Sequence, residues 1–435
     1  MDCISAKLLL HFIDQFHRLS LSFHSLHILW KIQVYYTMVL THLSIIPVDF
    51  SPSAVLYSTI VNAKQKEGTK IMAGSSFGTL FTVTTWGESH GKGLGAVVDG
   101  CPAGLLLDET WIQKFLDRRK PGQNRYTTAR RESDAVEILS GVFEGKTTGT
   151  PISLLVRNTD QRSRDYGDIA SCYRPGHADY TFDQKYGFRD YRGGGRSSGR
   201  ETIGRVAAGA IAVKILEELG VSFCTYTKAI GPVTATAFDP THILQDPLYM
   251  ADAEASAKAQ AYLKECMAAQ DSSGGVIECR VSGLPAGLGT PVFDKLDACL
   301  GKALFSIGAV KAVEIGDGID AARAKGSSNN DGFFHDADGA VKKSTNHAGG
   351  VLGGISDGSD LILRAHIKPT PSISSPQNTV NQDGEDIQIR IKGRHDPVIV
   401  PRAVVVVESM TALTLVDALL TGMGARMENL KKVWK

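Results

Sequence analysis

Short apolar runs alternate with glycine-containing turns over much of the chain. Residues 77–85 and 93–98 are rich in β-branched, aromatic and other apolar side chains, and each run predicts a strand. The turn at 100–105, Gly-Cys-Pro-Ala-Gly-Leu, leads into a stretch that predicts a helix at 109–119, with Asp108 as its N-cap. This region therefore follows the order strand, strand, turn, helix.

The same order returns in the second half of the chain. Residues 275–281 predict a strand, and 283–288 form a second turn, Gly-Leu-Pro-Ala-Gly-Leu. Thr290 is then expected to cap a helix that has Pro291 at its first position and ends near Phe305. The repeat predicts an internally duplicated α+β architecture; the alternative is chance recurrence of a short turn motif.

A long helix is expected at 199–219. Ser198 and Glu201 have the spacing of a capping box, and Gly220 can end the helix. Its expected buried face contains Ile203, Val206, Ala210, Ile211 and Leu216.

Three further segments have clear patterns. Residues 251–270, rich in Ala, Lys, Glu and Gln, predict an exposed helix. The apolar run at 404–407 predicts a buried strand, and residues 320–348 predict a polar surface loop.

The first 71 residues differ from the rest and are expected to lie outside the fold. They hold five of the twelve histidines, and the apolar run at 8–40 is interrupted by charges that argue against a membrane span. An organelle transit peptide, or a start codon assigned too early, would also explain them. Met72-Ala73-Gly74 resembles a natural beginning, so residues 72–430 are expected to form one domain with two pseudo-repeated halves.

Composition narrows the function classes. Lys plus Arg (47) nearly balance Asp plus Glu (46), so charge gives no reason to expect nucleic acid as a partner. The seven cysteines form no CxxC pair and no zinc spacing, which favours a reducing, cytoplasmic compartment, with a plastid as the alternative if a transit peptide is present. No GxGxxG follows a strand, and the P-loop-like 141–147 has three residues between its glycines where four are required.

The strongest local signal is Gly-Gly-Gly-Arg-Ser-Ser-Gly-Arg-Glu at 193–201. A triple glycine before a capped helix leaves backbone N–H groups free for an anion, which the helix dipole also favours; the plain alternative is a flexible turn and cap. Arginines cluster at 118–131, and nine lie between Arg157 and Arg205. Guanidinium groups suit phosphate and carboxylate, so a small, multiply anionic ligand is expected, although many of these arginines must form a solvated face or structural ion pairs.

Three histidine-bearing loops are candidates for proton transfer. His90 lies in Gly-Glu-Ser-His-Gly directly after a strand, and His177 lies in Arg-Pro-Gly-His-Ala-Asp. A histidine between small residues, oriented by Ser or Asp, can act as a general acid near neutral pH, although each alone is more often structural. Asp396 belongs to a third motif, Gly-Arg-His-Asp-Pro, and His347 is a weaker candidate for which a structural role is favoured.

Taken in order, the motifs at 87–91, 160–163, 174–179, 193–198, 346–354 and 393–397 resemble chorismate synthase, over residues 72 to about 428. The resemblance implies a sandwich of antiparallel sheets around helices with internal two-fold character, assembled as a homotetramer. It also implies conversion of 5-enolpyruvylshikimate 3-phosphate to chorismate and phosphate, the last step of the shikimate pathway. The family needs reduced FMN, although the reaction has no net redox change.

The resemblance further implies roles for individual residues. His90 would protonate the leaving phosphate, His177 would keep the reduced flavin correctly protonated, and Asp396 with Ser89 would relay a proton from it. Substrate anions would be bound by Arg119, Arg125, Arg174 and Arg394. FMN would meet Arg196, Ser197, Ser198, Gly308, Ala309, Gly353, Lys368, Pro369, Thr370, Pro371, Ser372 and Arg394.

Some points depart from the pattern or stay open. Gly308 stands where Asn is common in the family, and Lys120 stands where a third arginine is usual. The motifs leave open whether the protein reduces its flavin with NADPH or depends on an external flavin reductase. A binding protein for anions or flavin is one rival hypothesis, but it leaves the histidines unexplained. A nucleotide-dependent oxidoreductase is the other, and the missing Rossmann pattern counts against it.

Overall fold

The computed structural model describes residues 74–127, 132–159, 170–391 and 396–435. The chain divides into two compact units, Met1–Met72 and Ala73–Lys435, and all described residues belong to the second. The expected N-terminal extension, Arg394 and the motif at 160–163 lie outside the described residues.

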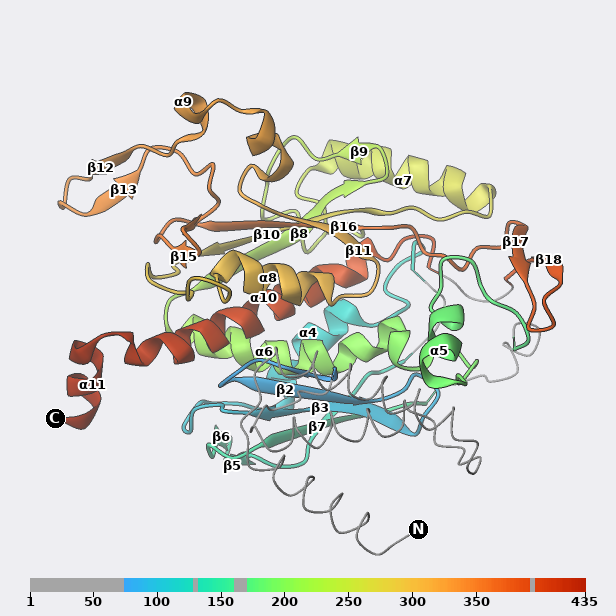
Figure 1. Cartoon of the computed structure of the whole chain (residues 1–435), viewed down its shortest axis with the longest axis horizontal. Helices are drawn as coiled ribbons and strands as arrows, with labels where there is room; N and C mark the ends of the chain where they lie inside the picture. The colour runs from blue at the N-terminus through green and yellow to red at the C-terminus, as the bar shows by residue number, and fades with distance from the viewer. Residues whose placement is uncertain (1–73, 128–131, 160–169, 392–395) are drawn as a thin grey trace, which may run out of the picture. The chain divides into compact units, whose positions relative to one another are not determined.

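Two five-stranded antiparallel sheets enclose a layer of helices (Figure 1). The first sheet has the order β1-β2-β3-β7-β4, with strands at Ser76–Phe77, Thr82–Gly87, Gly93–Asp99, Ile152–Arg157 and Val136–Ile138. The second has the order β9-β8-β10-β16-β11, with strands at Val233–Thr234, Ser222–Ile230, Gly275–Ser282, Leu361–Ile367 and Val310–Ile315.

The helices between the sheets complete a repeat. They are α4 (Glu109–Arg119), α6 (Thr202–Glu218), α8 (Leu296–Phe305) and α10 (Val400–Gly422). Along the chain, the first half runs β2-β3-α4-β4-β7-α6 and the second runs β8-β10-α8-β11-β16-α10. Corresponding strands hold the same places in their sheets. The predicted duplicated α+β sandwich is therefore confirmed.

Smaller elements fill the connections of this framework. In the first half these are β5 (Val142–Phe143), β6 (Lys146–Thr147), α5 (Asp179–Tyr186), and the short 3₁₀ helices at Gly195–Ser197 and Gly199–Glu201. The second half adds α7 (Ala253–Ala268), a 3₁₀ helix at Gly318–Arg323, α9 (Gly326–Asn329), β12 (Phe333–His335), β13 (Val341–Lys343), β14 (Val351–Leu352), β15 (Ile355–Ser356), β17 (Gln377–Val380), β18 (Asp386–Ile389), a 3₁₀ helix at Met423–Ala425 and α11 (Met427–Trp434).

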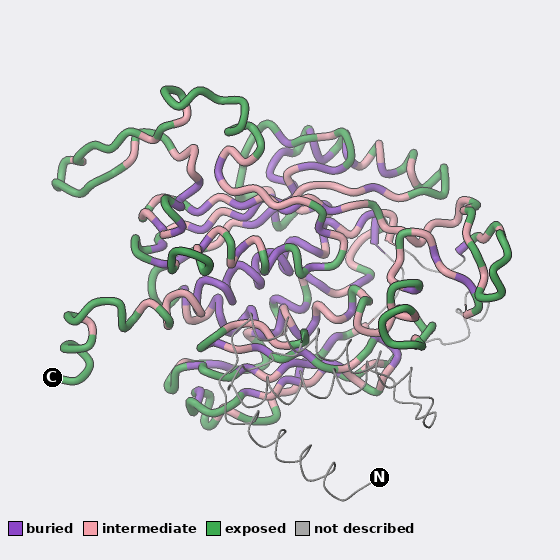
Figure 2. Tube along the Cα trace, in the orientation of Figure 1, coloured by how far each residue is buried: buried purple, intermediate pink, exposed green. Residues whose placement is uncertain are grey.

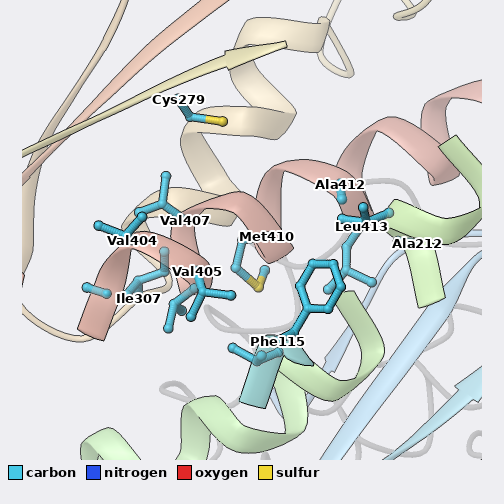
Figure 3. Packing of buried hydrophobic residues seen from close by; sticks show 14 of the residues in the cluster. Phe115, Ala212, Cys279, Ile307, Val404, Val405, Val407, Met410, Ala412 and Leu413 are labelled. Atoms are coloured by element: carbon cyan, nitrogen blue, oxygen red, sulfur yellow. The ribbon is translucent and has the colours of Figure 1, made fainter. Parts of the chain in front are cut away.

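Helix α10 is the centre of the core. It packs against α4, α6, α8, β8 and β10, and the buried residues concentrate in this helical layer (Figure 2). Figure 3 shows Met410 and Leu413 of α10 close to Phe115 of α4. Among the described residues, Val400–Ala425 is the segment long and apolar enough to span a membrane, and 72% of its most apolar window is buried inside the protein. Its apolar character therefore matches its place in the core.

The halves meet where α6 crosses α10. A Cβ atom added to Gly209 of α6 would lie 2.2 Å from Cβ of Ser409 on α10, which is closer than real contacts allow. The absence of a side chain at Gly209 therefore lets the two helix backbones approach closely.

Several predicted elements have the expected bounds. The helix at 109–119 is α4, and the Asp108 side chain accepts a hydrogen bond from Trp111 N at 2.7 Å. The predicted strands at 93–98 and 275–281 are β3 and β10, and the helix at 251–270 is α7. The expected buried face of α6 is buried, and Gly220, with φ of +78°, follows its C-cap.

Two predictions near the helix termini are wrong in detail. The second-half helix begins at Leu296 and not at Pro291, because Thr290 N donates to Asp294 O and closes an exposed turn in which Phe293 is 90% exposed. Ser198 does accept a hydrogen bond from Arg200 N, but the reciprocal half of the capping box is absent. Glu201 instead accepts from Thr85 Oγ1 at 2.8 Å.

Three other segments also differ from prediction. The expected strand at 77–85 is broken into β1 and β2, because the backbone N–H groups of residues 79–81 donate to the carboxylate of Asp417. The run at 404–407 belongs to α10; a short apolar run that is buried on all sides does not distinguish strand from helix. Residues 320–348 are largely exposed, as expected, but include α9 and the β12–β13 hairpin.

Candidate active site

The turn between β2 and β3 carries the first candidate pair. Ser89 Oγ lies 3.0 Å from His90 Nδ1, and each residue is 6% exposed. The turn closes through a hydrogen bond from Gly91 N to Glu88 O. The buried serine hydroxyl therefore holds the Nδ1 edge of the imidazole in a fixed orientation.

The triple-glycine loop packs against both candidate histidines. A Cβ atom added to Gly193 would lie 2.4 Å from His90 Cε1, and one added to Gly194 would lie 2.9 Å from His177 Cε1. Both glycines have positive φ, +77° and +115°. A side chain at either position would clash with a histidine ring and would also strain the backbone, so only glycine fits. Because neighbouring Cα atoms are only about 3.8 Å apart, the loop brings the two imidazoles to one place.

His177 is held by a buried ion pair. Arg174 donates to both carboxylate oxygens of Asp179, at 2.7 and 2.6 Å, and His177 Nδ1 lies 3.0 Å from Asp179 Oδ1. Burial opposes ionisation of Asp179, but the hydrogen bonds from Arg174 and His177 prevail and hold its pKa well below its usual range. A permanent carboxylate at Nδ1 leaves Nε2 of His177 on the side of Gly194, where an added Cβ would be 3.2 Å away.

The arginine and serines after the triple glycine have different partners. Arg196 donates to Thr85 Oγ1 at 2.6 Å and to Gly87 O at 3.0 Å, so it fastens the end of β2. Ser197 Oγ donates to Gly194 O, and Ser198 Oγ accepts from Arg200 N. The backbone of this loop is thereby fixed in place.

A cavity of about 310 Å³ opens beside the loop. Its wall includes Gly194, Gly195, Arg196 and Ser197, and it continues past Asp179 to the aromatic side chains of α5. The predicted cofactor-binding residues 196–197 therefore line a real depression next to His177.

The 368–372 loop of the second half reaches this site. Lys368 Nζ donates to Gly176 O at 2.7 Å, and a Cβ atom on Gly176 would lie 3.2 Å from Pro371 Cβ. Lys368 N donates to Ala309 O, which brings residues 308–309 to the same loop. Thr370 Oγ1 is buried and has no hydrogen-bond partner among the described residues. Loops from both halves therefore meet beside His177.

Gly353, another predicted FMN contact, lies near the start of α8. It belongs to the turn between β14 and β15, and the next residue, Gly354, accepts a hydrogen bond from Leu296 N at the start of α8. Gly308 and Ala309 follow the other end of α8, a helix of 10 residues, which corresponds to about 15 Å. Gly353 thus lies near the opposite end of α8 from residues 308–309, and its contact with FMN stays a prediction.

The arginines predicted to bind substrate differ in burial and in their partners. Arg119 is 2% exposed and donates to Asp134 Oδ2, Thr202 Oγ1 and Gly199 O. Burial and the charge of Arg402 lower the pKa of Arg119 to about 10, so it stays cationic at neutral pH. Arg125 is exposed and stacks on Tyr126, with its guanidinium carbon 4.9 Å from the ring centre. Arg119 and Arg174 thus both have carboxylate partners, and their roles toward substrate stay predictions.

Asp396 is held by an arginine of α10. Arg402 Nη1 donates to Asp396 Oδ2 at 2.6 Å, and Arg402 Nε donates to Arg119 O at 3.2 Å. These contacts place Asp396 at the junction of α4 and α10, and its proposed proton relay with Ser89 stays a prediction. Arg394, two residues earlier, lies outside the described residues.

Sequence reasoning missed a buried polar network behind His90. Asp134, 1% exposed and with φ of +45°, accepts from both Arg119 and Arg200, each at 3.0 Å. Arg200 Nε also donates to Asn158 Oδ1, while its Nη2 is buried without a hydrogen-bond partner among the described residues. Arg200 lies within the glycine-loop motif, but nothing in the sequence pairs it with residues 134 and 158.

The fold and site define a class: an internally duplicated α+β sandwich whose histidines and cationic side chains meet at loops from both halves. The family model for chorismate synthase matches residues 81–420. Chorismate synthase from Agathobacter rectalis is 67% identical over 366 residues, which is 84% of this chain and 100% of that protein. Chorismate synthase from Chloroflexus aurantiacus is 53% identical over 356 residues, 82% of this chain and 98% of the relative.

A solved structure gives the same result. The crystal structure of a chorismate synthase matches with a TM-score of 0.65 and 32% sequence identity, covering 82% of this chain and 96% of that one. The chain belongs to the chorismate synthase family. It is therefore a lyase of that family, and both the predicted family and the predicted fold are confirmed.

Proposed function

We propose that the protein catalyses the 1,4-elimination of phosphate from 5-enolpyruvylshikimate 3-phosphate to give chorismate, with reduced FMN as cofactor. The observation that supports this most is the triple-glycine loop, which packs against His90 and His177 on consecutive residues. A site of this kind offers two oriented imidazoles next to a helix N-terminus and backbone that suits anions.

The residues at the proposed FMN site fit the cofactor. Lys368 supplies a cation for a phosphate, and Thr370 Oγ1 is a buried polar atom without a hydrogen-bond partner among the described residues. Gly308 is open, since a Cβ atom there would meet nothing within 4 Å. We assign FMN binding to these residues and to residues 196–198. Reduced FMN, when bound, supplies the electron density that promotes departure of phosphate.

The elimination removes a hydrogen from C6 as well as phosphate, and we assign the relay of that proton to Asp396 with Ser89. The protein's other residues perform the remaining tasks. His90, oriented by Ser89 Oγ, protonates the departing phosphate and so makes it a better leaving group. Asp179 Oδ1 holds His177 at Nδ1, and this orients Nε2 of the ring toward Gly194. Arg125 and Arg394 attract the anionic substrate, and Arg174 orients His177 through Asp179.

Anaerobic turnover with chemically reduced FMN tests the proposal. Chorismate and phosphate should appear in equal amounts, and neither should appear with oxidised FMN. The variants His90→Ala and His177→Ala should each lower turnover at least about tenfold with folding intact, as expected for a general acid. Tight binding of FMN and substrate without product would instead identify a binding protein.

The same assay addresses the reductant. NADPH added anaerobically with oxidised FMN should start turnover if the protein reduces its own flavin. Turnover that begins only when a separate flavin reductase is supplied assigns that task to an external partner.

We further propose a homotetramer. Exposed apolar side chains on α11 support self-association: Met427, Leu430, Val433 and Trp434 are 67%, 39%, 59% and 81% exposed. Light scattering coupled to size exclusion should give four times the chain mass, and a monomeric mass at micromolar concentration would contradict the proposal.

A further inference from the structure

A side chain outside the assigned motifs holds the turn that carries His90. Asn158 directly follows β7, the strand that pairs with β3. Its Nδ2 donates to Glu88 O at 3.0 Å and to Gly91 O at 2.8 Å. These two carbonyl groups lie on either side of Ser89 and His90, so one amide bridges both ends of the turn.

The Asn158 residue is itself held by further hydrogen bonds, one to its side-chain oxygen and one from its backbone N–H. Arg200 Nε donates to Asn158 Oδ1 at 2.8 Å, and Asn158 N donates to Lys92 O. With its oxygen accepting and both hydrogens donated, the Asn158 side chain has one orientation that satisfies all its partners. Arg200 is in turn bound to the buried carboxylate of Asp134.

We propose that Asn158 is a positioning residue, which fixes the Ser89–His90 turn and links it to the Arg200–Asp134 network. The inference rests on the proposed role of His90 as general acid. Arg200 lies four residues after Arg196 of the glycine loop, so the loop and the His90 turn are held by one connected set of hydrogen bonds. Displacement of an acid by about 1 Å can lower a rate on the order of 100-fold.

A double-mutant cycle separates positioning from general structural support. In the otherwise wild-type protein, Asn158→Ala should lower kcat about 10- to 100-fold and change KM less than about threefold, because the Asn158 amide is already bonded to the His90 turn and to Arg200. In the His90→Ala background, the same substitution should change kcat less than about twofold, since it acts through His90.

A second substitution divides the two functions of the amide. Asn158→Asp keeps an acceptor for Arg200 but places a carboxylate oxygen against Glu88 O and Gly91 O. It should therefore lower kcat about as much as Asn158→Ala, while preserving the Arg200 contact and the fold. Asn381→Ala is the matched control, because that amide bonds Glu385 in the exposed β17–β18 hairpin, and its kcat should equal wild type.

The outcomes are distinct. An equal loss of kcat from Asn158→Ala in both backgrounds would show a general structural role and overturn the inference. Wild-type kcat for Asn158→Ala, together with a slow His90→Ala enzyme, would overturn the inference and leave the proposed function standing. A His90→Ala enzyme at the wild-type rate would remove the acid role and, with it, the positioning role.

Discussion

The two halves of the chain share one topology but use its connections differently. The connection from β7 to α6 in the first half carries Asn158, His177 and the triple glycine. Its counterpart from β16 to α10 carries the 368–372 loop and Asp396. These corresponding connections touch each other, through Lys368 and Gly176 and through the Tyr173 N–Val380 O hydrogen bond. The site is therefore built where equivalent parts of a duplicated unit meet.

The interiors of the halves also differ. The first half buries charge: Asp134 and Arg119 are 1% and 2% exposed, and both belong to the network behind the site. The second half contributes α10, whose residues from Val400 to Val416 are buried except for Arg402. The second half also buries charge, since Glu278 is 1% exposed, but the charged network behind the site lies in the first half. The predictions below test this division.

The largest effect is expected where the first half buries charge. Asp134→Asn keeps the shape and tolerates the positive φ, but it leaves the buried Arg119 without its anion and Arg200 with Glu132 alone. Removing one partner of a buried ion pair lowers the free energy of unfolding by about 3–5 kcal/mol. Urea denaturation measures this loss. The exposed pair Asp117–Lys120 is the control, and Asp117→Asn should cost less than about 1 kcal/mol.

The next largest effect is a pH-dependent loss of stability at Asp179, in the connection from β7 to α6. The pKa of Asp179 is lowered in the folded protein, so its ion pair with Arg174 stabilises above the unfolded pKa of about 3.9 and is lost as pH falls through the folded pKa. Asp179→Asn should lower the free energy of unfolding by about 1.5–3 kcal/mol at neutral pH. The difference in free energy of unfolding between Asp179→Asn and wild type should become smaller below about pH 4. A difference that stays constant down to pH 3 would show that Asp179 contributes no charge-dependent stability.

A smaller effect is expected at the junction of the halves. Gly209→Ala would bring a Cβ atom to 2.2 Å from Ser409 Cβ and push α6 away from α10. Overpacking of this kind lowers the free energy of unfolding by about 1–3 kcal/mol. Ser409→Gly in the same chain should restore part of the loss, which thermal denaturation of the single and double variants would measure. No rescue would show that the strain lies elsewhere.

The smallest effect on stability is expected at residues 308–309, which follow α8 in the second half. In the variant Gly308→Asn, which introduces the residue that the resemblance leads us to expect there, the added Cβ atom meets no atom within 4 Å. The substitution should change the free energy of unfolding by less than about 0.5 kcal/mol. FMN affinity should nevertheless change severalfold, because the loop is assigned to the cofactor. Gly326→Asn in α9 is equally open and should leave FMN affinity unchanged. Equal affinities in both variants would remove residues 308–309 from the FMN site.

Local signals in the sequence were enough for some elements and not for others. The N-cap at Asp108 and the glycine at 220 act within one turn, so α4 and the end of α6 were predictable. The run at 404–407 is helical and not the predicted strand. It is buried because α10 packs against three helices and two strands, and no local pattern encodes those contacts. The start of α8 was misplaced because Thr290 pairs with Asp294 in place of capping a helix.

The same limit applies to the site. His90 and His177 stand in motifs that can be read along the chain, and the glycine loop explains why they meet. The partners of the arginines could not be read in this way. Arg119 pairs with a residue 15 positions away, and Arg200 with one 66 positions away. Which guanidinium is available to a ligand depends on where the carboxylates fall in three dimensions.

The meeting of the two corresponding connections affects how the protein can change by mutation. In a pair of identical chains, one codon change alters both sides of a shared site at once. Here Gly176 and Pro371 face each other but are encoded separately, so each side can vary while the other is conserved. A duplicated gene fused into one reading frame can therefore evolve an asymmetric site, with histidines on one side and a cationic loop on the other.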